Sequence, residues 1–239
     1  MSLVRERWEL EEEFSALFEE IEGYSAYQAS GFTHPAWPVI PAGDSSRALA
    51  VRWGLVPFWA KTQEDARTIR TKTLNSRSET SHQLPSFRSL VNTRRCIIPV
   101  DGFFEPHRYE GKSYPFYIRR KDGRPFALAG LWDANPGLET STFTVLTLPA
   151  TGIIADIHNK KLRMPLLLPG ELYARWADPG VTWEEANTHA WEAAVRMTGE
   201  LTAHPVGPLL YSRRTDTNIP EVRAPYKYGI SAVDHLIAS

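Results

Sequence analysis

Three polar side chains, far apart in the chain, have the groups needed to transfer protons at a reacting centre or to hold a reacting group by hydrogen bonds. Glu105 ends an apolar strand beside a glycine turn, where partial burial would raise its pKa and let it exchange protons near neutral pH. His158 precedes a polar loop, and its imidazole titrates in the same range. Asn75 has an amide that both donates and accepts hydrogen bonds, which suits it to holding a polar reacting group. Each also has a structural interpretation: an ion-paired glutamate, a hydrogen-bonded core histidine and an Asx-turn residue.

A second group of side chains is suited to binding phosphates. Residues 61–124 contain fourteen Lys/Arg against seven Asp/Glu, whereas the whole chain has a net charge of −1. This basic segment indicates a local anionic partner, or it solvates one face of a sheet. Arg77 and Arg163 are candidate phosphate clamps, because a guanidinium matches two phosphate oxygens. Thr147 either donates its hydroxyl to a phosphate or sugar of the same partner, or is an ordinary β-strand threonine.

Aromatic residues near strand ends are candidates for contact with nucleic acid bases. Trp53, Trp59 and Trp132 are each suited to stacking on a base or to packing in the core. Pro35 and Trp37 follow the first helical segment and are a candidate wedge against a nucleic acid.

Several classes of site and protein are not expected. Cys96 is the single cysteine of 239 residues, which excludes an internal disulfide and a cysteine-built zinc site, and its apolar neighbours predict burial. The histidines show no pairing at ligand spacing, so we expect no metal and no cofactor. Apolar runs such as Phe126–Trp132 are much shorter than the roughly 20 residues of a membrane span. With no apolar signal core near residue 1, we expect a cytoplasmic monomer.

The elements that must position these residues can be predicted in outline. Apolar residues at helical spacing predict a helix over Trp8–Ile21 that ends at Gly23, and the Pro- and Gly-rich residues 31–46 predict an extended loop. Further helices are predicted at Gly170–Ala177 and Trp183–Met197. Strands are predicted at Ala48–Trp53, Cys96–Val100, Phe116–Arg119, Phe126–Leu131, Thr142–Leu148 and Met164–Leu168.

The connections between these elements favour one fold class. Asp122 and Gly123 separate two predicted strands by a typical hairpin turn. The tail from Leu201 lacks periodicity, and no linker divides the chain. Consecutive strands in the middle indicate an α+β fold: a single domain over residues 1–239, built on a mainly antiparallel, barrel-like β-sheet with flanking helices.

Five short segments in this order resemble the SRAP family, the SOS response-associated peptidases that process abasic sites in single-stranded DNA. The resemblance covers about Val51 to Tyr211. The matching segments are Trp53–Trp59, Leu74–Thr80, Arg94–Glu105, Ala129–Trp132 and His158–Pro165. The chain departs from the family pattern at Ser76 and Pro106, which stand for alanine and tryptophan, and in the longer spacing between His158 and Arg163.

The resemblance implies a catalytic residue at position 2, where the family has a cysteine and this chain has Ser2. An α-amine forms a Schiff base with the aldehyde of an opened abasic sugar, and a neighbouring thiol then closes a stable thiazolidine. A serine hydroxyl does this poorly, so we expect the chain to bind without a stable crosslink. Ser2 is either a cloning scar or a natural variant, and Ser2→Cys is expected to restore the adduct.

By the resemblance, Asn75, Glu105 and His158 would assist ring opening and imine formation, and the same centre would remove the initiator methionine. Arg77, Arg163, Thr147, Trp53 and Pro35 would contact the DNA. Two other interpretations remain open. One is a non-catalytic binder of single-stranded DNA, which would bind intact and abasic strands alike. The other is a peptidase-type hydrolase that uses Glu105 and His158.

Overall fold

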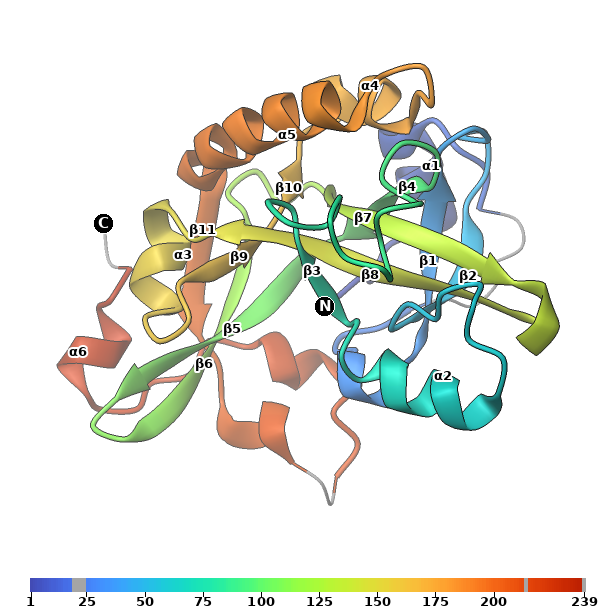
Figure 1. Cartoon of the computed structure of the whole chain (residues 1–239). Helices are drawn as coiled ribbons and strands as arrows, with labels where there is room; N and C mark the ends of the chain where they lie inside the picture. Colours follow the sequence, from blue (N-terminus) through green and yellow to red (C-terminus); the bar gives the residue numbers. More distant parts are fainter. Residues whose placement is uncertain (19–24, 213–214, 238–239) are drawn as a thin grey trace.

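A closed, barrel-like sheet forms the centre of the molecule (Figure 1). The computed structural model describes residues 1–18, 25–212 and 215–237. The strands pair in the ring order β7, β4, β1, β2, β8 and back to β7, antiparallel except where β2 meets β8. The ring strands are β1 (Ala36–Pro41), β2 (Leu49–Trp53), β4 (Arg95–Val100), β7 (Phe126–Asn135) and β8 (Thr140–Pro149). The α+β fold with a mainly antiparallel, barrel-like sheet is confirmed.

Strand β4 lies at the centre of the core, because all six of its residues are buried. Helix α4 (Tyr173–Ala177) packs against β4 and α5 (Trp183–Met197) against β10 (Leu167–Leu168), and both helices lie across the top of the sheet in Figure 1. Cys96 is fully buried, as predicted, and its carbonyl accepts a hydrogen bond from the Trp176 indole. Arg95 is also fully buried and donates to backbone carbonyls, so this member of the basic segment does not face an anionic partner.

A second, three-stranded antiparallel sheet packs beside the barrel in the order β11, β6, β5. Its strands are β5 (Gly102–Tyr109), β6 (Lys112–Arg120) and β11 (Leu201–Pro205). The predicted hairpin at Asp122 and Gly123 is wrong, because this turn connects β6 to β7 in the other sheet. The hairpin lies instead between β5 and β6, where Glu110 and Gly111 both have positive φ angles of 46° and 76°, as a tight hairpin requires.

The N-terminal helix is shorter than predicted. Helix α1 spans Arg7–Phe14 and ends where Ser15 adopts a left-handed conformation, with φ 51°. Leu17 then forms a bridge with Arg47 instead of continuing the helix. Ile21 and Gly23, the predicted last turn and end, lie outside the described residues.

Two segments predicted as irregular contain strands. Residues 31–46 include β1, and the tail from Leu201 begins with β11. Pro38 and Pro41 are tolerated in β1 because Ala36–Val39 pair only with β2 and Ile40–Pro41 only with β4, which leaves each proline an unpaired side. Predicting these strands therefore requires knowing which strands they pair with, and a local sequence pattern does not contain that information.

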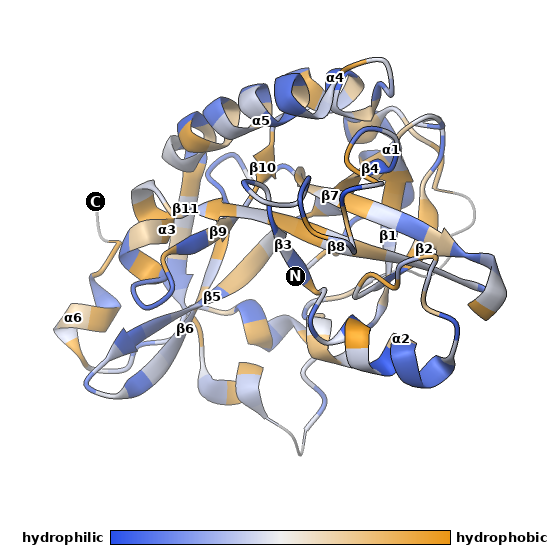
Figure 2. Cartoon of the chain, in the orientation of Figure 1, coloured by the Kyte–Doolittle hydropathy of each residue, from blue (hydrophilic) through white to orange (hydrophobic). Residues whose placement is uncertain are grey.

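The remaining elements connect and flank the two sheets. Thr182 caps α5 by accepting a hydrogen bond from the Glu185 amide. Figure 2 shows mostly polar residues along α2 and apolar residues along the barrel strands. The other elements are α2 (Gln63–Arg70), β3 (Asn75–Arg77), α3 (Gly152–Ile157), β9 (Arg163–Pro165), β10 (Leu167–Leu168), α6 (Ser231–Asp234), and the 3-10 turns Gly31–Thr33, Pro136–Leu138, Gly170–Leu172, Thr198–Glu200, Pro208–Tyr211 and Pro220–Arg223.

Gly130 of β7 is required by the packing inside the barrel. A Cβ at this position would lie 2.5 Å from Ile98 Cδ1 and 2.8 Å from the Thr144 carbonyl oxygen. We expect Gly130→Ala to lower the free energy of unfolding by about 2–3 kcal/mol through overpacking, measured by urea denaturation. Gly199→Ala is the matched control, since nothing lies within 4 Å of its Cβ position. Equal stability of the two variants would contradict this account.

Candidate active site

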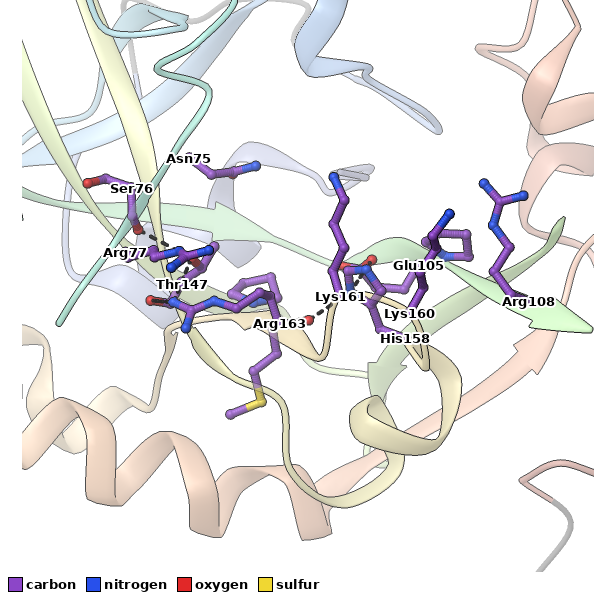
Figure 3. A pocket seen from close by; sticks show the side chains of 13 residues that line it. Asn75, Ser76, Arg77, Glu105, Arg108, Thr147, His158, Lys160, Lys161 and Arg163 are labelled. Atoms are coloured by element: carbon purple, nitrogen blue, oxygen red, sulfur yellow. Dashed lines mark hydrogen bonds and ion pairs between the residues drawn. The ribbon is translucent and has the colours of Figure 1, made fainter. Parts of the chain in front are cut away.

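Residues from four separate segments line one pocket of about 480 Å³ (Figure 3). Glu105 and His158, which were predicted from the sequence as proton-transfer residues, line it together with Asn75, which was predicted to hold a reacting group. Arg77, Thr147 and Arg163 also line it. The convergence of the three polar side chains on a single pocket depends on pairings between β3, β8 and β9 and on the placement of β5 beside α3.

The register of three strands places the phosphate-binding candidates together. Strand β3 pairs with β8 so that Arg77 lies opposite Thr147, and β9 pairs with the other edge of β8. Arg163 consequently donates to the Thr147 carbonyl at 2.6 Å and to its hydroxyl at 3.1 Å. Its guanidinium also forms a two-pronged ion pair with Glu79, at 2.5 and 2.8 Å. A phosphate at Arg163 would therefore compete with the Glu79 carboxylate.

Glu105 and His158 form a direct pair. Their closest atoms, His158 Nδ1 and Glu105 Oε2, are 3.1 Å apart. The same Nδ1 lies 2.8 Å from the Arg163 carbonyl oxygen, which can only accept, so Nδ1 carries the proton and Nε2 is an acceptor. Burial lowers the pKa of His158, against the opposing hydrogen bond to Arg163, which keeps the imidazole neutral at pH 7.

The environment of Glu105 reverses the usual charge states of a carboxyl group and an amine. Burial raises the pKa of Glu105 to about 8, and the nearby amino terminus lowers it only partly. Burial likewise lowers the pKa of the Met1 α-amine to about 5, although Glu105 opposes this. At pH 7 the carboxyl group therefore holds its proton while the amine is neutral. A neutral amine has the lone pair that attack on an aldehyde requires.

A second pocket, of about 390 Å³, adjoins the first through the shared residues Asn75, Glu105 and Pro106. Met1 and Trp53 line it, and Trp53 is fixed by an indole hydrogen bond of 2.8 Å to the Leu74 carbonyl. Its walls also include Phe32, which is 79% exposed. The site thus has a basic side and an aromatic side, with Glu105 between them.

Two predicted site residues lie elsewhere. Ser2 is fully buried and lines neither pocket, and its hydroxyl donates to the Ala26 carbonyl at 3.3 Å and accepts from Arg223 at 3.3 Å. Pro35 is half-buried, lines neither pocket, and accepts a hydrogen bond from the Trp53 amide. The sequence placed both near the reacting sugar, but the backbone hydrogen bonds that direct them away come from residues distant in the chain.

The other tryptophans differ in exposure. Trp37 is fully buried and donates to the Pro99 carbonyl, so the prediction that it forms an exposed wedge is wrong. Trp132 is half-buried beneath the Arg94 guanidinium. Trp59 is 42% exposed, and its role as a stacking residue stays a prediction.

Sequence reasoning missed several residues of the site. Arg108, Lys160 and Lys161 line the first pocket with Arg77 and Arg163, and Figure 3 shows them around the Glu105–His158 pair. Among the described residues that line this pocket, Glu105 is the single acid. The adjacency of the two lysines to His158 was the available signal, whereas nothing in the sequence marked Arg108 or Met1.

The described ranges contain neither a metal-binding cluster nor a membrane-spanning helix. Within them, no three histidine, cysteine or acidic side chains are grouped so that they could hold a metal ion. No helix of that part of the chain combines the length and hydropathy needed to cross a bilayer.

Comparisons with known proteins match this architecture. The family model described as SOS response associated peptidase (SRAP) matches residues 2–212. The chain is 34% identical over 186 residues to the abasic site processing protein YoqW of Bacillus subtilis, covering 72% of this chain and 80% of that protein. It is 30% identical over 214 residues to the abasic site processing protein HMCES of Gallus gallus, covering 79% and 61%.

A solved structure is also similar. A protein from Bacteroides thetaiotaomicron superposes with a TM-score of 0.83 at 27% identity, over 95% of this chain and 98% of that one. The family match over nearly the whole chain, the named relatives and this shared fold agree. The chain belongs to the SRAP family.

Proposed function

We propose that the protein recognises abasic sites in single-stranded DNA and reacts with the opened sugar through an amine at its amino terminus. The main support for this proposal is that Asn75, Glu105 and His158 line a single pocket, and that the neutral α-amine of Met1 lies in the adjoining one. The relatives that are named abasic site processing proteins support the same substrate class.

The basic side of the site would hold the DNA backbone. Cationic side chains line the first pocket and can each approach a phosphate: Arg77, Arg108, Lys160, Lys161 and Arg163. The aromatic side, with Phe32 and Trp53, offers surfaces on which a flanking base would stack. A strand crossing both sides would place its sugar next to Glu105.

The residues at the centre divide the proton transfers. Glu105, protonated at pH 7, would donate its proton to the oxygen that leaves as the sugar opens or as the imine forms. His158 Nε2 is the neutral acceptor for the proton released by the attacking amine. Amine nitrogen and aldehyde carbon then form the imine with loss of one water, and Asn75 would hold the opened sugar by hydrogen bonds.

A stable thiazolidine needs a thiol beside the imine. Cys96 is fully buried in β4, and position 2 is Ser2, so this chain would bind and form a reversible imine without the stable crosslink. Autocatalytic removal of the initiator methionine would be weak for the same reason, since a serine hydroxyl is a poorer nucleophile than a thiol.

Binding to three matched oligonucleotides tests the proposal. We expect roughly tenfold tighter binding of an abasic strand than of the intact strand by fluorescence anisotropy. We also expect a covalent adduct on a denaturing gel after borohydride reduction of the imine. A tetrahydrofuran analogue, which cannot open, should bind without being trapped. Equal affinity for abasic and intact strands, with no trapped adduct, would favour a non-catalytic single-strand binder instead.

A further inference from the structure

We infer that position 1 of this chain, and not position 2, is the residue that meets the abasic sugar. The inference rests on the proposed function, because it names the position that would react in that site. It predicts that a cysteine made at position 2 faces the wrong surroundings, whereas a cysteine placed one residue earlier faces the aldehyde.

The first observation is the difference in surroundings between Met1 and Ser2. Met1 lines the pocket that also contains Asn75 and Glu105, and its α-amine donates to the Ala29 carbonyl at 2.9 Å. Ser2 lines neither pocket of the site. Its backbone N–H donates to the Gly102 carbonyl at 2.9 Å, and its hydroxyl contacts Ala26 and Arg223.

The second observation is that backbone hydrogen bonds fix this register. Ser2 pairs with Gly102 as an antiparallel bridge, and Leu3 pairs with Ala26 through reciprocal bonds of 2.8 Å. The Ala29 amide donates to the Met1 carbonyl at 2.8 Å. The first three residues are therefore held as a short strand between two partners.

Hydrogen bonds from the next two residues, Val4 and Arg5, fix the same register. Asp101, nearly fully buried, accepts from the Val4 amide at 2.7 Å and from the Arg5 guanidinium at 2.6 Å. Arg223, from the C-terminal tail, lies 3.5 Å from Asp101 and 4.8 Å over the Tyr27 ring. These contacts tie residues 2–5 to Asp101 between β4 and β5, to the first residue of β5 and to the tail.

A slip of one residue toward the pocket is opposed by this arrangement. Moving the strand by about 3.4 Å would exchange its two faces, because side chains alternate along a strand. Leu3, which is 1% exposed, would leave the core, and Val4 and Arg5 would lose Asp101. Once Met1 is removed, the amine of residue 2 would therefore stay at the Gly102 carbonyl, about one residue short of Glu105.

A cysteine inserted between Met1 and Ser2 would occupy the place of Met1 once the initiator is removed. Its amine would attack the aldehyde carbon, and water would leave as the imine forms. The thiol sulfur would then bond to the imine carbon while its proton moves to the nitrogen, which closes the thiazolidine. Residues from Ser2 onward would keep all the contacts described above.

The test compares heat-stable adducts of four proteins with an abasic oligonucleotide on a denaturing gel, without borohydride. They are the natural chain, Ser2→Cys, the chain with cysteine inserted before Ser2, and a control with serine inserted there. Intact mass confirms removal of Met1 in the variants, and thermal melting confirms folding. We expect at least tenfold more adduct from the inserted cysteine than from Ser2→Cys, and background from the inserted serine.

The outcomes separate this inference from the proposed function. If Ser2→Cys gives as much adduct as the inserted cysteine, the register is not fixed and the inference is overturned while the function stands. If neither cysteine variant crosslinks but borohydride traps the natural chain, the inference again fails alone. If borohydride traps nothing and no variant crosslinks, the proposed function fails together with the inference.

Discussion

Glu105→Gln is expected to stabilise the protein at pH 7.5 by about 2–3 kcal/mol. Glu105 has a pKa of about 8 in the folded protein, against 4.5 as its ordinary value, so folding at pH 7.5 requires proton uptake. Each pH unit between the two values costs about 1.4 kcal/mol. Glutamine takes up no proton, but burial of its polar amide offsets part of the gain.

The dependence of this gain on pH is a sharper measurement. The Met1 amine, with a folded pKa of about 5 against 8.0, adds stability as pH rises from 5 to 8, because the unfolded chain binds more protons. Glu105 does the opposite over nearly the same range, so the natural chain should show little change. In Glu105→Gln only the amine contributes to this pH dependence. The free energy of unfolding, measured by urea titration, should therefore rise from pH 5 to pH 8.

Glu79→Gln is a control variant that should change stability in the opposite direction to Glu105→Gln. Burial would raise the pKa of Glu79, but the hydrogen bond and charge of Arg163 outweigh it and lower the pKa. The ionised carboxylate thus stabilises the fold at neutral pH, and its removal should lower the melting temperature slightly. If both glutamine variants shift stability in the same direction, the assigned protonation of Glu105 is wrong.

The same Glu105→Gln variant should lose about 100-fold in the rate of borohydride-trapped imine formation, because an amide cannot transfer the proton. Its affinity for the tetrahydrofuran analogue, measured by anisotropy, should change little. A gain in stability together with a slower reaction is typical when function requires an ionisable group to keep a protonation state that it would not have in water. Unchanged trapping would remove Glu105 from the mechanism.

Arg163→Ala should weaken binding of single-stranded DNA by about 10- to 50-fold at 0.1 M salt. In the proposed function the variant would remove a charge-assisted phosphate contact, and it removes the ion-pair partner of the Glu79 carboxylate. Because phosphate contacts carry no base information, abasic and intact strands should be affected alike. The slope of log affinity against log salt should become shallower by about 0.7.

Two variants test this assignment. Arg88→Ala removes the same charge from a different pocket, lined by Glu79 and Trp183, and should change affinity less than threefold. Arg163→Lys keeps the charge without the two-pronged geometry and should be intermediate. An Arg88→Ala loss as large as that of Arg163→Ala would indicate a general charge effect.

The parts of the fold with local signals were predictable. Apolar runs such as Cys96–Val100 and Phe126–Leu131 are central strands, and the periodic segment Trp183–Met197 is α5. Helix α1 was overestimated because apolar spacing continued past Ser15, whose left-handed conformation ends the helix. Strand β5 was missed because Glu105, Pro106 and His107 interrupt its apolar pattern.

The identities of the central residues were likewise available from short motifs. Asn75, Glu105 and His158 stand in segments whose order resembles one family, and the structure brings the three into one pocket. Their electrostatics were not available, because the pKa of Glu105 depends on burial by groups far along the chain.

By itself, the sequence determined which chemical groups the site contains and which segments form the barrel, since side-chain type and local periodicity are properties of neighbouring residues. The tertiary structure alone decided that Met1, and not Ser2, lines a pocket together with Glu105, and that basic side chains line the adjoining pocket. The physical reason is that register is set by hydrogen bonds such as those of Ser2 to Gly102 and Val4 to Asp101, about a hundred residues apart. A shift of one residue would leave the local pattern unchanged and move Met1 out of the pocket.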